Sequence, residues 1–283
     1  MKERTHMLAN KKVAFIGAGS MAEAMISGIL TKKILLPQQI NVTNRSNKEK
    51  LLLLQEQYHV NTFYNYQEVL PKMDIIIFAI KPKDIAETIG KIKEFTTNKQ
   101  IFISILAGVS TSCISQLLCH EAPIIRTMPN TSAAVGQSIT AISGGSSAKE
   151  EHTMLAETLF KAIGEVVTVE EQKLDAITGL SGSGPAYIYY LIEAMEIGAK
   201  EIGLDEELAK QLIAQVLIGA AERIKSTTLS SKTLYKQVMS PGGTTEAGFK
   251  VLESFQYQEA MVECIKRAAQ RSTELGKQYS VVK

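Results

Sequence analysis

The chain has 283 residues, of which 45% are apolar and 21% are charged, and its formal net charge is +2 at pH 7. This length and this composition predict a globular protein of two domains. We expect no nucleic-acid, metal or membrane site, because basic residues do not cluster, histidines and cysteines lack ligand spacing, and no apolar run approaches roughly 18 residues. The expected location is therefore cytoplasmic.

The first part of the chain, up to about residue 170, alternates short apolar runs with longer amphipathic stretches. Continuous β-branched runs are typical of strands that helices cover on both faces. We therefore predict a doubly wound α/β domain of the Rossmann type over residues 1–170. The expected strands are Val13–Ile16, Ile40–Thr43, Asp74–Ile80, Ile101–Leu106, Ile124–Thr127, Ile139–Ile142 and Glu165–Val169. The expected helices are Met21–Thr31, Lys48–Tyr58, Ile85–Phe95, Ser110–Leu118 and Glu150–Ala162.

The first expected strand leads into the glycine fingerprint "GAGSMA" at residues 17–22, where a helix begins. Its first glycine permits a tight turn, and its second lets a pyrophosphate approach the backbone at the helix N-terminus. An NAD site usually has an acid at the end of the second strand, where this chain has Asn44, Arg45 and Ser46. A guanidinium and a hydroxyl favour a 2′-phosphate, so we predict NADPH over NADH. A solvated loop arginine is the alternative reading of Arg45.

The expected strand Asp74–Ile80 ends in "AIKPKD", residues 79–84. In doubly wound folds, loops at the carboxyl ends of the strands face the crevice that binds the ligand. We therefore expect Lys81 and Pro82 to line the cofactor site. A helix start without a functional role is an equally supported alternative.

After about residue 170 strand-like runs disappear, and apolar residues recur at spacings of three and four, which is typical of helices. Long helices are expected at 186–203, 205–226 and 257–277, the first buried most of the way round and the second capped by Asp205. We assign residues 171–283 to an all-α domain. Its apolar surface exceeds what one small bundle can bury, which favours a homodimer over packing onto the chain's own α/β domain. Higher homo-oligomers would use the same helices.

Two segments rich in glycine and serine interrupt the helical part, "GLSGSGPAY" at 179–187 and "SPGGTT" at 240–245. A glycine in a helix interior lowers the stability of the helix by roughly 1 kcal/mol relative to alanine. Such clusters therefore belong at helix caps or where the backbone approaches a ligand. A simple interhelical turn is the alternative for each segment.

Together these motifs resemble the pyrroline-5-carboxylate reductases, the enzymes of the last step of proline biosynthesis. The resemblance covers about residues 12–275 and rests, in family order, on "FIGAGSMAEAMISG", "AIKPKD", "ILAGVS", "RTMPNTSAAVG", "TGLSGSGPAYIYYLIEAM", "LIGAAERI" and "SPGGTTEAG". It implies an N-terminal Rossmann-type domain and a C-terminal all-α dimerisation domain. It also implies reduction of Δ1-pyrroline-5-carboxylate to L-proline by NADPH.

The resemblance implies a set of site residues as well. Those for the cofactor are Gly17, Ala18, Gly19, Ser20 and Met21 at the pyrophosphate, Asn44, Arg45 and Ser46 at the 2′-phosphate, Asn65 at the adenosine, and Ala79, Ile80, Lys81, Pro82, Ala107 and Gly108 at the nicotinamide half. Those for the substrate, at a site formed at the dimer interface, are Ser240, Gly242, Gly243, Thr244 and Thr245. The Ser240 hydroxyl and the glycine amides would bind the carboxylate. Thr245 would contact the ring nitrogen, so Ser240 and Thr245 are the catalytic candidates.

Three positions before the 240–245 loop depart from the family pattern. Thr228 and Lys236 stand where acidic residues are usual, and Met239 stands where a small hydroxyl residue is common. The roles of those family side chains are therefore not transferred to this chain.

Two alternative functions remain open. A related NADP-dependent dehydrogenase for another small acid would rely on a lysine in the helical domain, and we find no such lysine in a matching motif. A non-catalytic nucleotide-binding paralogue would be expected to lack Ser240, Thr245 or the loop glycines, which are all present.

Overall fold

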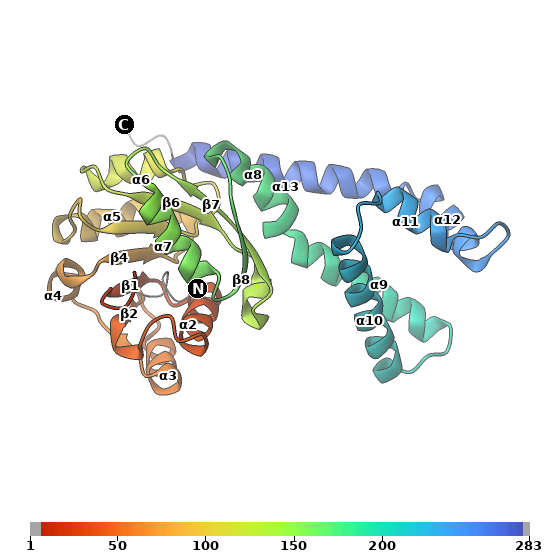
Figure 1. Cartoon of the computed structure of the whole chain (residues 1–283), viewed down its shortest axis with the longest axis horizontal. Helices are drawn as coiled ribbons and strands as arrows, with labels where there is room; N and C mark the ends of the chain where they lie inside the picture. The colour runs from red at the N-terminus through yellow and green to blue at the C-terminus, as the bar shows by residue number, and fades with distance from the viewer. Residues whose placement is uncertain (1–6, 280–283) are drawn as a thin grey trace. The chain divides into compact units, whose positions relative to one another are not determined.

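The structure is a computed structural model that describes residues 7–279, and Figure 1 labels most of its helices and strands. The chain divides into two compact units. The first unit contains the described residues up to Ser183 together with those from Arg267 onward, and the second unit is Gly184–Lys266.

An eight-stranded sheet forms the centre of the first unit, in the order β3-β2-β1-β4-β5-β6-β7-β8. Neighbouring strands from β3 through β6 pair in parallel, and the order 3-2-1-4-5-6 is that of the Rossmann fold. This confirms the predicted fold class. The strands are β1 (Val13–Ile16), β2 (Ile40–Thr43), β3 (Asn61–Thr62), β4 (Ile75–Phe78), β5 (Ile101–Ser104), β6 (Ile124–Met128), β7 (Ser138–Gly144) and β8 (Gly164–Thr168).

The last two strands depart from the parallel arrangement that the apolar runs predict. Strand β7 runs antiparallel to β6, and β8 is parallel to β7. The connection from Met128 to Ser138 holds only a short 3₁₀ turn, Thr131–Val135. A parallel crossover needs a dozen or more residues, so this connection reverses the chain direction.

Helices cover both faces of the sheet. One face carries α2 (Ser20–Thr31), α3 (Lys48–Tyr58) and α7 (Glu150–Phe160), and the other carries α5 (Ile85–Ile92) and α6 (Thr111–Leu118). Strand β1 shows why both faces must be covered, because Val13 and Phe15 belong to the first apolar cluster while Ala14 and Ile16 belong to the second. All residues of β1, β2, β4 and β5 are buried, as the continuous apolar runs predict.

Two predicted strands are shorter than expected, and two small elements were missed. Strand β4 ends at Phe78 and β5 ends at Ser104, so the residues that follow form loops at the carboxyl edge of the sheet. The short helix α4 (Tyr66–Val69) and the two-residue strand β3 have too few residues to give a periodic signal.

The first unit continues past residue 170, where the composition changes. Its further elements are α8 (Leu174–Ile177), a π-helical turn (Thr178–Gly182) and the last part of α13 (Tyr257–Tyr279). Asp175 on α8 bonds to Arg126 of β6 and to Ser272 of α13, which ties both helices to the sheet. The compact units therefore differ from the division between residues 170 and 171, which stays a prediction.

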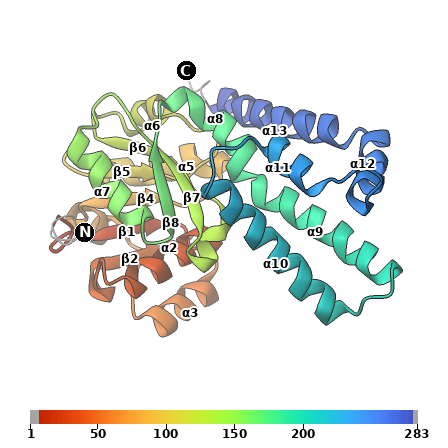
Figure 2. The ribbon, with the colours of Figure 1, turned by 45° about the vertical axis from the view of Figure 1, so that its right-hand side comes forward.

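The second unit consists of α9 (Gly184–Glu201), α10 (Glu206–Lys225), α11 (Ser231–Val238), α12 (Thr244–Ser254) and the start of α13. Helices α9 and α10 form a hairpin (Figure 2), and the Asp205 side chain caps α10 by accepting from the Leu208 amide, as predicted. The expected burial of α9 is wrong for the single chain, because only Ala199 of this helix is buried. Tyr190 on α9 is 78% exposed, so among residues 7–279 nothing covers this part of the apolar pattern.

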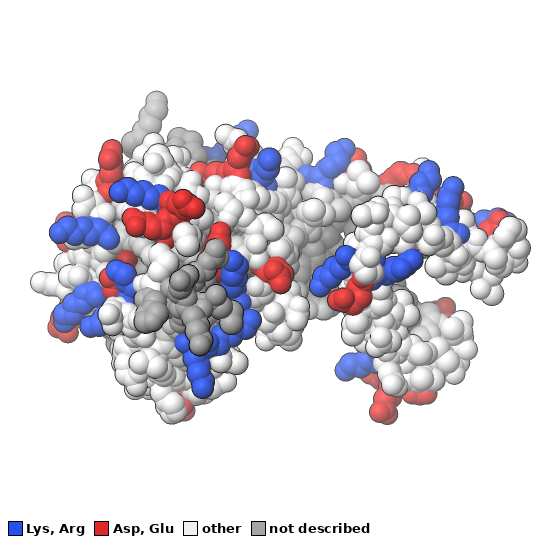
Figure 3. All heavy atoms as spheres, viewed as in Figure 1, with Lys and Arg blue, Asp and Glu red and all other residues white. Residues whose placement is uncertain are grey.

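The surface shows mixed charges. On the face drawn in Figure 3, lysine and arginine side chains are interspersed with aspartate and glutamate. Within residues 7–279, no helix is long and apolar enough to cross a membrane.

Candidate functional site

The turn after β1 has the geometry that a dinucleotide fingerprint requires. Gly17 has a φ of +116°, and its amide donates to the Thr43 carbonyl of β2 at 2.8 Å. A Cβ atom at this position would overlap the carbonyl of Ala79, so only glycine fits. A Cβ atom on Gly19 would meet nothing within 4 Å, which leaves open space beside the backbone. The turn thus fits a pyrophosphate approaching at Gly19.

Helix α2 supplies the donors for that anion. It begins at Ser20, and its N-cap residue is Gly19, which has no side chain that could accept from the first amides. The first amides of a helix have no acceptor within the helix and carry the positive end of its dipole. Ala22 is fully buried beneath this turn, which lets the helix pack closely on the sheet.

The loop after β2 presents Arg45 at the surface. The Asn44 side chain shapes this loop by accepting hydrogen bonds from the amides of Ser46 at 3.0 Å and Asn47 at 2.8 Å. The Arg45 side chain is 70% exposed. Its position at the carboxyl end of β2 fits a contact with a 2′-phosphate.

An acidic partner of Arg45 was missed by the sequence reasoning. Glu87 of α5 lies 3.3 Å from the Arg45 guanidinium, and Asp84 lies 3.9 Å away. A hydrogen bond from Lys91, followed by the charge of Arg45, lowers the pKa of Glu87, so this carboxyl is ionised at neutral pH. A 2′-phosphate at Arg45 would therefore compete with Glu87. The two residues are 42 positions apart, so no local pattern could have indicated the pair.

The remaining predicted cofactor residues follow the neighbouring strands at the same edge. Ala79 and Ile80 follow β4, and Lys81 is exposed before the short 3₁₀ turn that begins at Pro82. Asn65 follows β3 and caps α4, where its side chain accepts from Gln67 and donates to Glu68, and Ala107 and Gly108 follow β5. Because the carboxyl ends of parallel strands share one edge, the structure brings all the predicted cofactor residues together there.

The predicted substrate loop lies in the second unit, between α11 and α12. Gly242 has a φ of +73°, which favours glycine, and a Cβ atom on Gly243 would lie 2.5 Å from the Ser240 hydroxyl oxygen. The ring centroids of Tyr235 on α11 and Phe249 on α12 lie 5.1 Å apart, and this contact holds the two helices together beside the loop. The backbone of the loop therefore favours glycine at Gly242, and a side chain at Gly243 would displace the Ser240 hydroxyl.

Two amides of this loop already have acceptors. The Gly243 amide donates to the Ser240 carbonyl at 3.0 Å, and the Gly242 amide donates to the Glu246 carboxylate at 2.7 Å. The free amides that were expected to bind an anion are thus partly occupied, because a side-chain carboxylate already accepts from the Gly242 amide. Thr245 is half-buried in the first turn of α12. The bond between Glu246 and the Gly242 amide was not predicted from the sequence.

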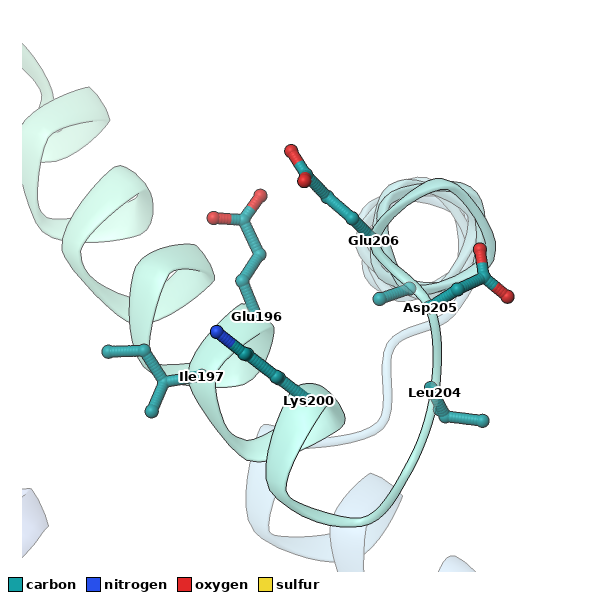
Figure 4. A pocket seen from close by; sticks show the side chains of 7 residues that line it. Glu196, Ile197, Lys200, Leu204, Asp205 and Glu206 are labelled. Carbon is teal, nitrogen blue, oxygen red and sulfur yellow. The ribbon is translucent and has the colours of Figure 1, made fainter.

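A pocket of about 430 Å³ between the end of α9 and the start of α10 contains none of the predicted site residues. Glu196 of α9 and Glu206 of α10 extend into the same space, with Lys200 close by (Figure 4). No group of three or more histidine, cysteine or acidic residues that could hold a metal ion occurs in the part of the chain that the structure describes.

Two family models match the chain. "Pyrroline-5-carboxylate reductase dimerisation" matches residues 171–275, and "NADP oxidoreductase coenzyme F420-dependent" matches residues 12–108. The chain is 44% identical to pyrroline-5-carboxylate reductase 2 of Bacillus subtilis (strain 168) over 270 residues, which cover 95% of this chain and 97% of the relative.

Solved structures are similar over the same extent. A pyrroline-5-carboxylate reductase from Coxiella burnetii matches with a TM-score of 0.82 and 34% identity. A Plasmodium falciparum pyrroline carboxylate reductase with NADP bound matches with a TM-score of 0.87 and 26% identity. Each match covers 94% of this chain and 98% of the other.

Proposed function

The chain belongs to the pyrroline-5-carboxylate reductase family, and we propose that it reduces Δ1-pyrroline-5-carboxylate to L-proline with NADPH. The observation that carries this proposal is the 44% identity over 95% of the chain, an extent that a shared nucleotide-binding domain alone would not give. The NADP(H) cofactor is supported by the family model over residues 12–108 and by the glycine turn after β1.

NADPH supplies the hydride that is added to the imine carbon of the substrate. The protein's part is to bind and orient. The Gly17–Gly19 turn and the first amides of α2 hold the pyrophosphate, and Arg45 holds the 2′-phosphate. The missing acid at the end of β2 favours NADPH over NADH, because a carboxylate there would repel the phosphate.

The loop at residues 240–245 holds the substrate. The carboxylate of the substrate accepts a hydrogen bond from the Ser240 hydroxyl. It also replaces the Glu246 carboxylate as the acceptor of the Gly242 amide, so one carboxylate is exchanged for another. The Thr245 hydroxyl donates a hydrogen bond to the ring nitrogen. This bond stabilises the nitrogen as the hydride adds to the neighbouring carbon, and the nitrogen takes up one proton from water, so that the imine becomes the amine of proline.

The protein assembles as a homodimer, or as a higher homo-oligomer built from dimers. The family model for dimerisation over residues 171–275 supports this assembly. Large apolar side chains of the second unit, among them Tyr190 at 78% and Phe255 at 79% exposure, are left uncovered in the single chain. A second copy would bury them in a self-complementary interface.

The direct test is a spectrophotometric assay of NADPH oxidation with pyrroline-5-carboxylate as the substrate, repeated with NADH. We expect oxidation that depends on the substrate and is faster with NADPH at limiting cofactor. If neither cofactor is oxidised above the rate without substrate, the proposed reaction is wrong.

Replacing Arg45 by alanine is expected to weaken NADPH binding about tenfold, because a charge-assisted bond to the 2′-phosphate is lost. NADH binding should change little. Glu87→Gln should have the opposite effect and strengthen NADPH binding about two- to fivefold, since an exposed competing ion pair is removed.

Both affinities can be measured by calorimetric titration, with Lys99→Ala as the control. Lys99 is exposed and precedes β5, so it lies at the opposite, amino edge of the sheet. An equal loss of NADPH and NADH affinity in Arg45→Ala would show that Arg45 does not read the 2′-phosphate.

A further inference from the structure

Gly108, in the loop that follows β5, contacts the backbone of α13 directly. Its φ is +76°, and a Cβ atom on it would lie 2.7 Å from the Ser272 carbonyl oxygen and 2.9 Å from the Gly276 nitrogen. A Cβ atom on Gly276 would overlap the carbonyl oxygen of Gly108. Both positions therefore require glycine, and Ser272 and Gly276, four residues apart, present one face of α13 to the loop.

Hydrogen bonds hold that face of α13 in place. Ser272 is 2% exposed, and its hydroxyl donates to Asp175 at 2.9 Å, while the Thr273 hydroxyl donates to the other oxygen of Asp175 at 3.1 Å. Asp175 in turn accepts from the buried Arg126 at 2.8 Å. Arg126 lies on β6, directly beside Ser104, the last residue of β5. The helix is thus fastened next to the strand that carries the Gly108 loop.

The same group of charges holds the other end of the loop. The amide and the hydroxyl of Thr111, where α6 begins, both donate to Glu171 at 2.7 Å. Glu171 lies 3.6 Å from the Arg126 guanidinium. The backbone between β5 and α6 is therefore fixed at Gly108 by α13 and at Thr111 by Glu171.

This loop lies on the nicotinamide side of the proposed cofactor site. The pyrophosphate belongs at the β1 turn and the adenosine at β2 and β3, so the nicotinamide half extends over β4 and β5. The inference that follows rests on the proposed function for this placement.

We propose that the end of α13 is a positioning element for the nicotinamide ring, which it orients by fixing the backbone at Gly108. The contact does not involve the adenosine half of the cofactor. Gly276 and Ser272 act through Gly108 and are positioning residues rather than catalytic ones.

The test uses the full-length protein and the variant Gly276→Ala, titrated by calorimetry with NADPH and with 2′,5′-ADP, which contains only the adenosine half. The added methyl group must push the Gly108 loop away. We expect the affinity for NADPH to fall at least about fivefold, as overpacking of a tight contact predicts, while the affinity for 2′,5′-ADP stays unchanged. The kcat should fall about tenfold, because hydride transfer is sensitive to small displacements.

Two further variants make the result decisive. Gly90→Ala in α5 is the matched control, because a Cβ atom there meets nothing within 4 Å, and it should leave both affinities unchanged. Ser272→Ala combined with Thr273→Val removes the bonds to Asp175 without adding bulk at the contact. Like Gly276→Ala, this double variant should lower the affinity for NADPH, but by a smaller factor.

The ratio of the two affinities decides the proposal without any substrate. If Gly276→Ala and the double variant leave NADPH affinity unchanged, or lower both affinities equally, the end of α13 does not position the nicotinamide. An unmodified protein that binds 2′,5′-ADP and NADPH but does not reduce pyrroline-5-carboxylate would contradict the proposed reaction and leave this proposal standing.

Discussion

Thr245→Ala is expected to lower kcat with pyrroline-5-carboxylate about 10²-fold, while NADPH affinity stays unchanged. The size follows from losing one positioned hydrogen bond to the atom that gains electrons in the reaction. The threonine lies half-buried in the first turn of α12, in the second unit, and the residues of the glycine turn lie in the first. Steady-state kinetics and NADPH titration on the same preparation measure the two quantities separately.

Two variants control this result. Thr245→Ser keeps the hydroxyl and should retain most of the turnover. Thr233→Ala removes a hydroxyl of the neighbouring helix α11, whose bond to Ser230 is exposed, and should have no effect on turnover. If Thr245→Ala lowers the affinity for NADPH by as large a factor as it lowers kcat, the 240–245 loop has been assigned to the wrong ligand.

Asp175→Ala is expected to lower the free energy of unfolding by about 3 kcal/mol, because it leaves a buried arginine without its main partner. The Arg126 side chain is 5% exposed, and its Nε atom has no hydrogen-bond partner in the structure. The variant also removes the acceptor of Ser272 and Thr273, so α13 should loosen from the sheet. Urea denaturation at a fixed protein concentration measures the loss, since an oligomer's stability depends on concentration.

Glu222→Ala is the control for this prediction. Glu222 forms an exposed ion pair with Lys225 on α10, and its removal should change stability by less than about 0.5 kcal/mol. Arg126→Met combined with Asp175→Ala should cost less than the sum of the two single variants, because the uncompensated charge is gone. Strictly additive losses would contradict the coupling between Arg126 and Asp175.

Local patterns predicted the elements that dominate the first unit. The bounds of β1, β2 and α3 agree with those predicted from the sequence. The glycine turn was predictable from a local pattern, since Gly17 has a φ of +116°, which favours glycine. The direction of β7 was not predicted, although the short connection from Met128 contained the information.

Contacts between distant residues could not be predicted from the sequence. Asp175 bonds to Arg126, 49 positions away, and to Ser272, 97 positions away, and neither spacing has a local signature.

The exposure of helix α9 was missed for a different reason. Its dense apolar pattern predicts a buried surface, but within residues 7–279 only Ala199 of this helix is buried. Where apolar surface is buried between copies of a chain, the sequence indicates that the surface is apolar, but it does not indicate which residues of the other copy cover it.

In the proposed reaction, this chain transfers a hydride from NADPH to the imine carbon of pyrroline-5-carboxylate. The most direct measurement uses NADPH carrying deuterium at both positions of the nicotinamide C4 carbon, with the proline product analysed by mass spectrometry. We predict L-proline with one deuterium, bound to the ring carbon that formed the imine. Proline without deuterium, or consumption of NADPH without proline, would contradict the proposed function.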